Sequence, residues 1–141
     1  MTHRILLAYD GTPPALAATE WVAKTFPDAS VTILTVLDPM EGFLDTFGYG
    51  SDQYDVWREE TETAANELLD EAVSAFGADA DVSTATQTGQ VPRAIIKYAT
   101  EHDIDHIVMG SHGRTGVSRV LLGSVAEAVV RRSPSTVTVV R

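Results

Sequence analysis

The chain has 141 residues with a hydrophobic fraction of 44% and a charged fraction of 21%, which predicts one ordinary folded domain over residues 1–141. A formal net charge of −10 argues against general nucleic-acid binding, and the absence of cysteine excludes disulfides, thiolate catalysis and cysteine-ligated metals. Residues 1–4 leave no room for a signal peptide and no apolar run approaches the ~20 residues of a membrane span, so we expect a cytoplasmic protein without a membrane partner.

The first third of the chain predicts a strand, a helix and a second strand. Residues 4–9 and 30–37 are apolar and β-branched runs, as in parallel strands that are covered on both faces. Thr12 is placed to cap the intervening helix, and Pro13 suits its first turn. Helical spacing gives this helix the inward positions Leu16, Thr19, Val22/Ala23 and Phe26.

The middle of the chain is acidic. Residues 38–52 predict a long irregular segment, whose aromatic side chains could cover a ligand, pack on the body or contact a second subunit. A long helix is expected over residues 53–76, with Gly77 as its stop and acidic residues on its outer face. Residues 81–87 predict a polar edge strand. The expected inward positions of the long helix are Ala64, Ala65, Leu68, Ala72 and Ala75/Phe76.

The last third predicts a helix after Pro92 that ends near His102, a strand over 106–109, a helix over 124–132 and a final strand over 136–140. Inward positions of the first of these helices are Ala94, Ile95, Tyr98 and Ala99. Arginines outnumber acids beyond Gly110, which suits a phosphate ligand, although a solvated basic face would look the same. The overall acidity also hints at a salt-adapted organism.

Five strands alternating with four helices predict an α/β fold with a five-stranded parallel doubly wound sheet, because each crossover must be right-handed. The strand order that such a chain favours is 3-2-1-4-5, with a switch point between the first and fourth strands. Ligands bind at such a point, beyond the carboxyl ends of the strands. We therefore expect Asp10 and Gly110 to meet there.

A glycine-containing loop follows the fourth strand and indicates a phosphate site. It carries Gly110, Gly113 and Gly116, and Gly123 then opens a helix. Glycines let backbone N–H groups turn toward an anion, and a helix start adds unpaired N–H groups. A Walker A loop is excluded because neither lysine lies in such a setting, and a dinucleotide fingerprint is excluded because residues 9–13 follow the first strand without the required glycines.

The spacing G-x2-G-x9-G-S, from Gly110 to Ser124, resembles the ATP-binding class of the universal stress protein family, and the resemblance covers essentially the whole chain. It implies a fold like that of the adenine nucleotide α-hydrolases. The family would place Ala8, Tyr9 and Asp10 at the adenosine, the Val36 backbone at the adenine edge, and Met109 and Gly110 against the ribose and phosphates. The residues implied around the phosphate chain are His112, Gly113, Gly123, Ser124 and Val125.

Three of these residues, Asp10, His112 and Ser124, also have a purely structural interpretation. Ser124 and Glu127 match a capping box, which by itself we favour over ligand binding, and Asp10 before Gly11 is an ordinary turn aspartate. His112 is interpreted as a phosphate donor or loop residue in preference to a general base, because no nucleophile or orienting carboxylate is evident. Trp21 and Trp57 are interpreted as packing residues. His3, His102 and His106 lack metal-ligand spacing.

The expected function is that of an ATP-binding homodimer acting as a stress-response or signalling module, with ADP or AMP as alternative ligands. The resemblance implies dimerisation through the edge strand Thr136 to Val140. Mg²⁺ or Mn²⁺ would be held through the phosphates, and no catalytic residues are assigned, so hydrolysis is slow or absent. Two alternatives stay open: a slow ATPase or nucleotidyl transferase of the related α-hydrolase type, and a nucleotide-free protein-interaction module.

Overall fold

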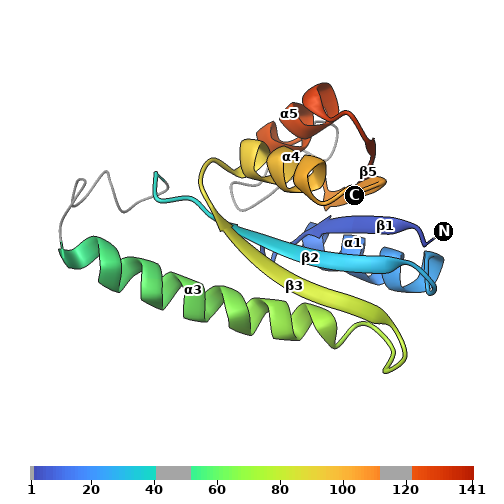
Figure 1. Ribbon diagram of the computed structural model, residues 1–141, viewed down its shortest axis with the longest axis horizontal. Helices are drawn as coiled ribbons and strands as arrows, with labels where there is room; N and C mark the ends of the chain where they lie inside the picture. Colours follow the sequence, from blue (N-terminus) through green and yellow to red (C-terminus); the bar gives the residue numbers. More distant parts are fainter. Residues whose placement is uncertain (1, 41–51, 112–121) are drawn as a thin grey trace.

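The computed structural model describes residues 2–40, 52–111 and 122–141, which form a parallel sheet with helices on both faces (Figure 1). The strand order β3-β2-β1-β4-β5 confirms the predicted 3-2-1-4-5 arrangement. The first and fourth strands are therefore neighbours, as expected for a switch point. The elements in chain order are β1 (Arg4–Ala8), α1 (Pro13–Thr25), β2 (Ser30–Leu37), α3 (Asp52–Val73), β3 (Asp81–Thr88), α4 (Val91–Glu101), β4 (His106–Gly110), α5 (Ser124–Arg132) and β5 (Thr136–Val140).

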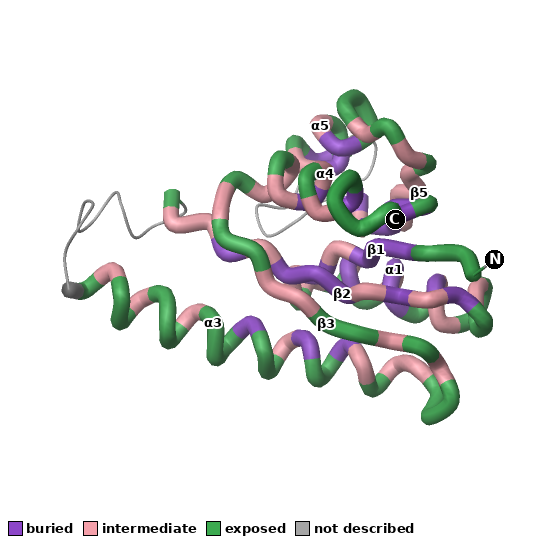
Figure 2. Tube along the Cα trace, in the orientation of Figure 1, coloured by how far each residue is buried: buried purple, intermediate pink, exposed green. Residues whose placement is uncertain are grey.

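Two apolar layers lie on opposite faces of the sheet. Alternate residues of a strand point to opposite faces, so Ile5 and Leu7 join the layer under α1 and α3, whereas Leu6 joins the layer under α4 and α5. Figure 2 shows the buried residues concentrated along the central strands and the inward side of α3. The central strands are thus covered on both faces, as their continuous apolar runs predict.

The helix α1 packs through small side chains, which corrects one sequence expectation. Thr12 is its N-cap, as predicted, and Thr19 and Val22 are buried. Leu16, expected to face inward, is 43% exposed, and Ala15 and Ala18 take its place against the sheet. Small residues allow the closer approach of α1 to β4 that this packing requires.

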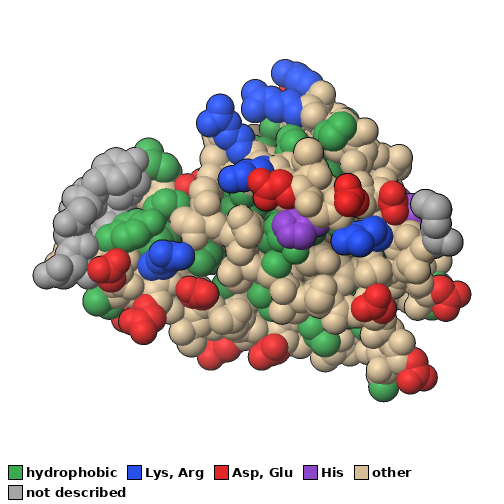
Figure 3. Space-filling model, viewed as in Figure 1, with side chains coloured by type: hydrophobic (Ala, Val, Ile, Leu, Met, Phe, Trp, Pro, Cys, Tyr) green, Lys and Arg blue, Asp and Glu red, His purple; other side chains and the backbone are tan. Residues whose placement is uncertain are grey.

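The long helix α3 differs from its expected bounds and inward face. It ends at Val73, before the predicted Phe76, and the N–H groups of Ala75 and Phe76 continue in a tighter turn by bonding Ala72 and Val73. Ala64, expected to be inward, is exposed at the surface, whereas Leu69 is only 1% exposed and enters the core. The outer face is acidic as predicted: Figure 3 shows acidic side chains over α3 and basic side chains over α5.

The strands β3 and β5 form the two edges of the sheet. The polar character of β3 agrees with its predicted edge position, and β5 has the predicted bounds. The expectation for residues 38–52 lies largely outside the described residues, since 41–51 are not among them. Within the described ranges, no helix combines the length and the apolar content needed to cross a membrane.

Candidate functional site

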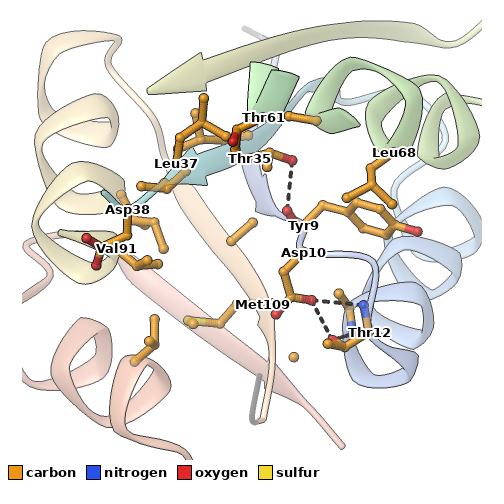
Figure 4. A pocket seen from close by; sticks show the side chains of 18 of the residues that line it. Tyr9, Asp10, Thr12, Thr35, Leu37, Asp38, Thr61, Leu68, Val91 and Met109 are labelled. Carbon is orange, nitrogen blue, oxygen red and sulfur yellow. Dashed lines mark hydrogen bonds between the residues drawn. The ribbon is translucent and has the colours of Figure 1, made fainter. Parts of the chain in front are cut away.

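A cavity of about 570 Å³ opens at the carboxyl ends of β1, β2 and β4, between the sheet, α3, the start of α4 and the start of α5 (Figure 4). Its size suits a small-molecule ligand, and its place is the switch point of the sheet. His112 and Gly113 lie outside the described residues. The other residues of the predicted site all line the cavity: Ala8, Tyr9, Asp10, Val36, Met109, Gly110, Gly123, Ser124 and Val125.

Asp10 occupies the turn between β1 and α1 with one carboxylate oxygen already engaged. Its Oδ1 accepts the Thr12 N–H at 3.0 Å and the Thr12 hydroxyl at 2.5 Å. Gly11 between them has φ = 79°, a conformation that favours glycine. The Thr12 hydroxyl also accepts the Ala15 N–H as the cap of α1. The turn and ligand interpretations of Asp10 are therefore compatible, because both of these bonds orient the carboxylate through Oδ1 alone.

Val36 presents backbone groups at the end of the β1–β2 ladder. The two strands pair as far as Ala8 opposite Leu34, and the Tyr9 N–H still donates to the Leu34 carbonyl at 2.9 Å. The Leu34 carbonyl thus faces β1, and backbone groups of alternate residues face the same side of a strand. The Val36 N–H and C=O therefore also face the β1 side, beyond the point where β1 ends. Val36 lines the cavity there. Within the described part of the chain, a donor and an acceptor just beyond the end of the ladder are thus available to a ligand.

The start of α5 corrects the predicted capping box. The N-cap is Gly123, not Ser124, and it provides no side-chain hydrogen bond. The Gly123 N–H donates to the Ser111 carbonyl at 2.7 Å, which sets the chain direction at the helix start, and the Glu127 side chain instead accepts from Arg131 at 2.6 Å. The first helical N–H groups, beginning with that of Ser124, therefore have no intrahelical acceptor, and the described residues provide no side-chain cap for them.

Gly110 is required by packing as well as by any ligand. A Cβ at this position would lie 2.7 Å from the Pro14 carbonyl carbon and 2.9 Å from the Ala15 nitrogen. These are backbone atoms of the first turn of α1, so they could not move aside cheaply. The glycine that ends β4 thus lets α1 approach the sheet, and it forms part of the cavity wall at the same point.

The helix α3 contributes a wall that the sequence interpretation missed. Trp57, interpreted as a packing residue, lines the cavity, as do Glu60 and Thr61. The spacing of Trp57, Thr61, Ala64 and Leu68 places them along one helix face, a signal that could have identified this wall. Other lining residues that were not predicted as site residues are Thr12, Ala15, Leu34, Thr35, Leu37, Asp38, Ala65, Val91 and Ile95.

The described cavity wall is acidic rather than basic. Asp10, Asp38 and Glu60 line it, and no lysine or arginine is among the described lining residues. Burial, together with the negative charges of Glu71 and Asp10, raises the pKa of the Tyr9 phenol, so this phenol stays neutral at physiological pH. Attraction for an anion in the described part of the site would therefore come from backbone N–H groups.

The three described histidines, His3, His102 and His106, do not line the cavity. His106 is buried at the start of β4, near the opposite end of the sheet, where its Nδ1 lies 3.4 Å from His3 Nε2. His102 stacks on Tyr98 at the surface, with the ring centroids 3.8 Å apart. Among the described residues, no group of three or more acidic or histidine side chains is arranged to hold a metal ion.

Comparison with known proteins agrees with this fold. The sequence model of the universal stress protein family matches residues 1–141. A relative in Staphylococcus saprophyticus that bears the universal stress protein name is 36% identical, over 97% of this chain and 82% of its own. The solved structure of hypothetical protein MJ0577 is 29% identical with a TM-score of 0.76, covering 99% of this chain and 96% of its own. A universal stress protein from Lactobacillus plantarum is 27% identical with a TM-score of 0.72, covering 99% and 97%.

Two further structures of the same fold were solved with adenine nucleotides. A universal stress protein in complex with cAMP is 23% identical to this chain, with a TM-score of 0.64. The universal stress protein from Archaeoglobus fulgidus in complex with dAMP is 22% identical, with a TM-score of 0.66. Some structural neighbours of this chain therefore bind adenine nucleotides.

Proposed function

This chain belongs to the universal stress protein family, and from that premise we propose that it binds an adenine nucleotide, foremost ATP, in the cavity at the switch point of the sheet. The observation that carries the proposal is that the Asp10 carboxylate, the Val36 backbone and the start of α5, for which the described residues provide no side-chain cap, converge on one cavity of nucleotide size. The cAMP and dAMP complexes of structural neighbours support the ligand class.

The adenosine half of the ligand would lie against β1 and β2. Adenine offers a ring nitrogen that accepts and an amino group that donates, which matches the free N–H and C=O of Val36. The ribose hydroxyls would donate to Asp10, whose orientation the Thr12 bonds fix. Ala8, Tyr9 and Met109 would supply the apolar and backbone surroundings of the nucleoside.

The phosphates would lie at the start of α5 beside Gly110. Backbone N–H groups at an uncapped helix start bind anions through direct hydrogen bonds and the helix dipole. Gly123, Ser124 and Val125 line the cavity at this point, and we propose that His112 and Gly113 complete the phosphate site. A Mg²⁺ or Mn²⁺ ion would be carried by the phosphates and their waters.

We further propose a homodimer that forms at the outer edge of β5, in a cytoplasmic single-domain protein. The Ser111 N–H donates to the Val140 carbonyl at 2.8 Å, so Val140 directs its backbone groups toward β4. Because alternate residues face opposite sides, Val137 and Val139 direct theirs to the open edge. Two such edges can pair and satisfy each other.

The biological role would be that of a nucleotide-loaded stress-response or signalling module with little or no hydrolysis. Phosphoryl transfer uses a cationic clamp and a positioned base, and the described wall offers three carboxylates instead. ATP bound to the folded state alone would stabilise it by mass action, by ~2.7 kcal/mol at a hundredfold excess over Kd.

The test is to purify the protein, denature it and identify the released nucleotide by chromatography and mass spectrometry, then to titrate nucleotide-free protein with ATP. We expect near one adenine nucleotide per chain and an ATP-dependent rise in melting temperature. Asp10→Asn should weaken ATP binding about tenfold or more, because the lost charge weakens the ribose hydrogen bonds. The matched control Asp79→Asn changes an exposed acid outside the cavity and should bind ATP as the wild type does.

If the wild-type protein contains no nucleotide and ATP does not change its melting temperature, the nucleotide proposal is wrong and the protein-interaction alternative is favoured. Steady release of phosphate or AMP that depends on Mg²⁺ would instead favour an enzyme.

A further inference from the structure

The side chain of Thr35 makes a hydrogen bond to the backbone of the adjacent strand's end, at the point where β1 and β2 separate. Thr35 is 4% exposed, and its hydroxyl donates to the Tyr9 carbonyl at 2.8 Å (Figure 4). Its neighbours Leu34 and Val36 are apolar, so the buried hydroxyl stands out in this strand. A buried hydroxyl needs a partner, and here that partner is a backbone carbonyl of the adjacent strand.

The Tyr9 carbonyl, which accepts the Thr35 hydroxyl, would otherwise accept the next hydrogen bond of the β1–β2 ladder. In a parallel ladder, a residue bonds the two residues that flank its partner on the next strand. Its N–H donates to the carbonyl of the residue before that partner, and its carbonyl accepts from the N–H of the residue after it. The Tyr9 N–H donates to Leu34, so the next bond in the pattern would run from the Val36 N–H to the Tyr9 carbonyl. The register instead ends with Ala8 opposite Leu34.

We infer that Thr35 is a positioning residue for the nucleobase: its hydroxyl satisfies the Tyr9 carbonyl in place of the Val36 N–H, which stays available to the ligand. This inference rests on the proposed nucleotide site. A buried carbonyl without the Thr35 hydroxyl would be unsatisfied, and the nearest backbone donor in the pattern is the Val36 N–H. The strand pair would then extend by one bond and consume the donor that reads the base.

The consequence is selectivity among nucleobases. Adenine accepts at N1 and donates from its amino group, so it matches a free N–H and C=O on one residue. Hypoxanthine presents the reverse, a donor at N1 and an acceptor at O6. A site with the Val36 N–H free therefore prefers ATP over inosine triphosphate, and a site in which that N–H is occupied loses the preference.

The first measurement is amide hydrogen exchange, resolved by residue with NMR, in the nucleotide-free wild-type protein. We expect the Val36 amide to exchange rapidly while the amides of the paired part of β2 are protected. Addition of ATP should protect the Val36 amide. Strong protection of Val36 in the nucleotide-free wild type would overturn the inference without any variant.

The second measurement compares Thr35→Val, which keeps the shape and removes the hydroxyl, with Thr35→Ser, which keeps the hydroxyl. In Thr35→Val we expect a protected Val36 amide without nucleotide, an ATP affinity lower by about tenfold, and an inosine triphosphate affinity changed by less than about threefold. Thr35→Ser, which keeps the hydroxyl, should keep both the rapid exchange of the Val36 amide and the preference for ATP that we expect in the wild type.

Two results separate this inference from the proposed function. In the first, the wild-type protein binds ATP, and Thr35→Val keeps both the ATP preference and the Val36 exchange rate of the wild type. This result would overturn the role of Thr35 but not the proposed nucleotide site. Wild-type protein that binds neither triphosphate would overturn the nucleotide site, and with it the role of Thr35 in reading a base.

Discussion

The Nε2 atom of His106 lies 2.6 Å from the Oγ1 atom of Thr138, which ties the buried strand β4 to the edge strand β5. The other ring nitrogen of His106 faces His3, whose Nδ1 lies 4.0 Å from the Asp105 carboxylate. The Phe26 ring covers the pair, 5.7 Å from the centroid of the His106 ring. This cluster lies at the amino ends of β1 and β4, away from the cavity, and we expect it to make the stability of the sheet depend on pH.

Stability should fall in mildly acidic solution because of His106. Burial, and secondarily the neighbouring His3, lowers the pKa of His106 below its usual 6.5. The unfolded chain therefore binds a proton more readily than the folded one. The contribution of neutral His106 to the free energy of unfolding is complete above pH 6.5. It is lost as the pH falls from there through the pKa that His106 has in the folded protein. Urea unfolding at intervals from about pH 8 to 5 measures this slope.

The matched variants are His106→Gln, which can still hydrogen-bond Thr138, and His102→Gln, which changes an exposed histidine. The first should flatten the loss of stability below pH 6.5, and the second should leave it as in the wild type. An unchanged slope in His106→Gln would assign the pH dependence to other groups.

Gly110→Ala should destabilise the fold by about 1–3 kcal/mol, because the added methyl group would meet backbone atoms of Pro14 and Ala15. The control is Gly77→Ala, where an added Cβ meets no atom within 4 Å, and its effect should stay within about 0.5 kcal/mol. Equilibrium unfolding in the absence of nucleotide separates packing from binding. Equal effects of the two substitutions would contradict the close approach of α1 to β4.

Ser124→Ala should leave the stability of the nucleotide-free protein within about 0.5 kcal/mol of the wild type. A capping box would lose ~1 kcal/mol on this change, but the structure assigns the cap to Gly123. Chemical denaturation without nucleotide distinguishes the two arrangements. A loss near ~1 kcal/mol would restore Ser124 as the cap.

Val139→Pro should convert the proposed dimer into folded monomers. Proline removes one N–H, and at Val139 that N–H faces the open edge of β5 rather than β4. Sedimentation velocity measures the association state, and circular dichroism checks the fold. The comparison variant Val140→Pro removes an N–H on the β4 side and should lower folding stability instead. A dimeric Val139→Pro protein would exclude this edge as the interface.

The sequence by itself determined the architecture of this protein. Continuous apolar runs and helical periodicity are local signals, and the handedness of crossovers converts their order into one sheet order, so β1 and β4 could be placed side by side although they are far apart in the chain. The same rule predicts that Asp10 and Gly110 meet at the switch point, and both line the cavity there.

Tertiary structure alone decided which side chains of α1 and α3 face the core or the cavity. The rotation of α1 and α3 about their axes depends on contacts with distant strands, so Leu16 lies outward, Leu69 inward, and Trp57 at the cavity. The helix α5 has its predicted bounds, but its N-cap is Gly123 rather than Ser124, and the Gly123 N–H donates to the distant Ser111 carbonyl. Thr35 bonds the Tyr9 carbonyl only because Tyr9 lies beside it, directly after the end of β1. Such choices are set by packing and hydrogen bonds between remote segments, which no local pattern records.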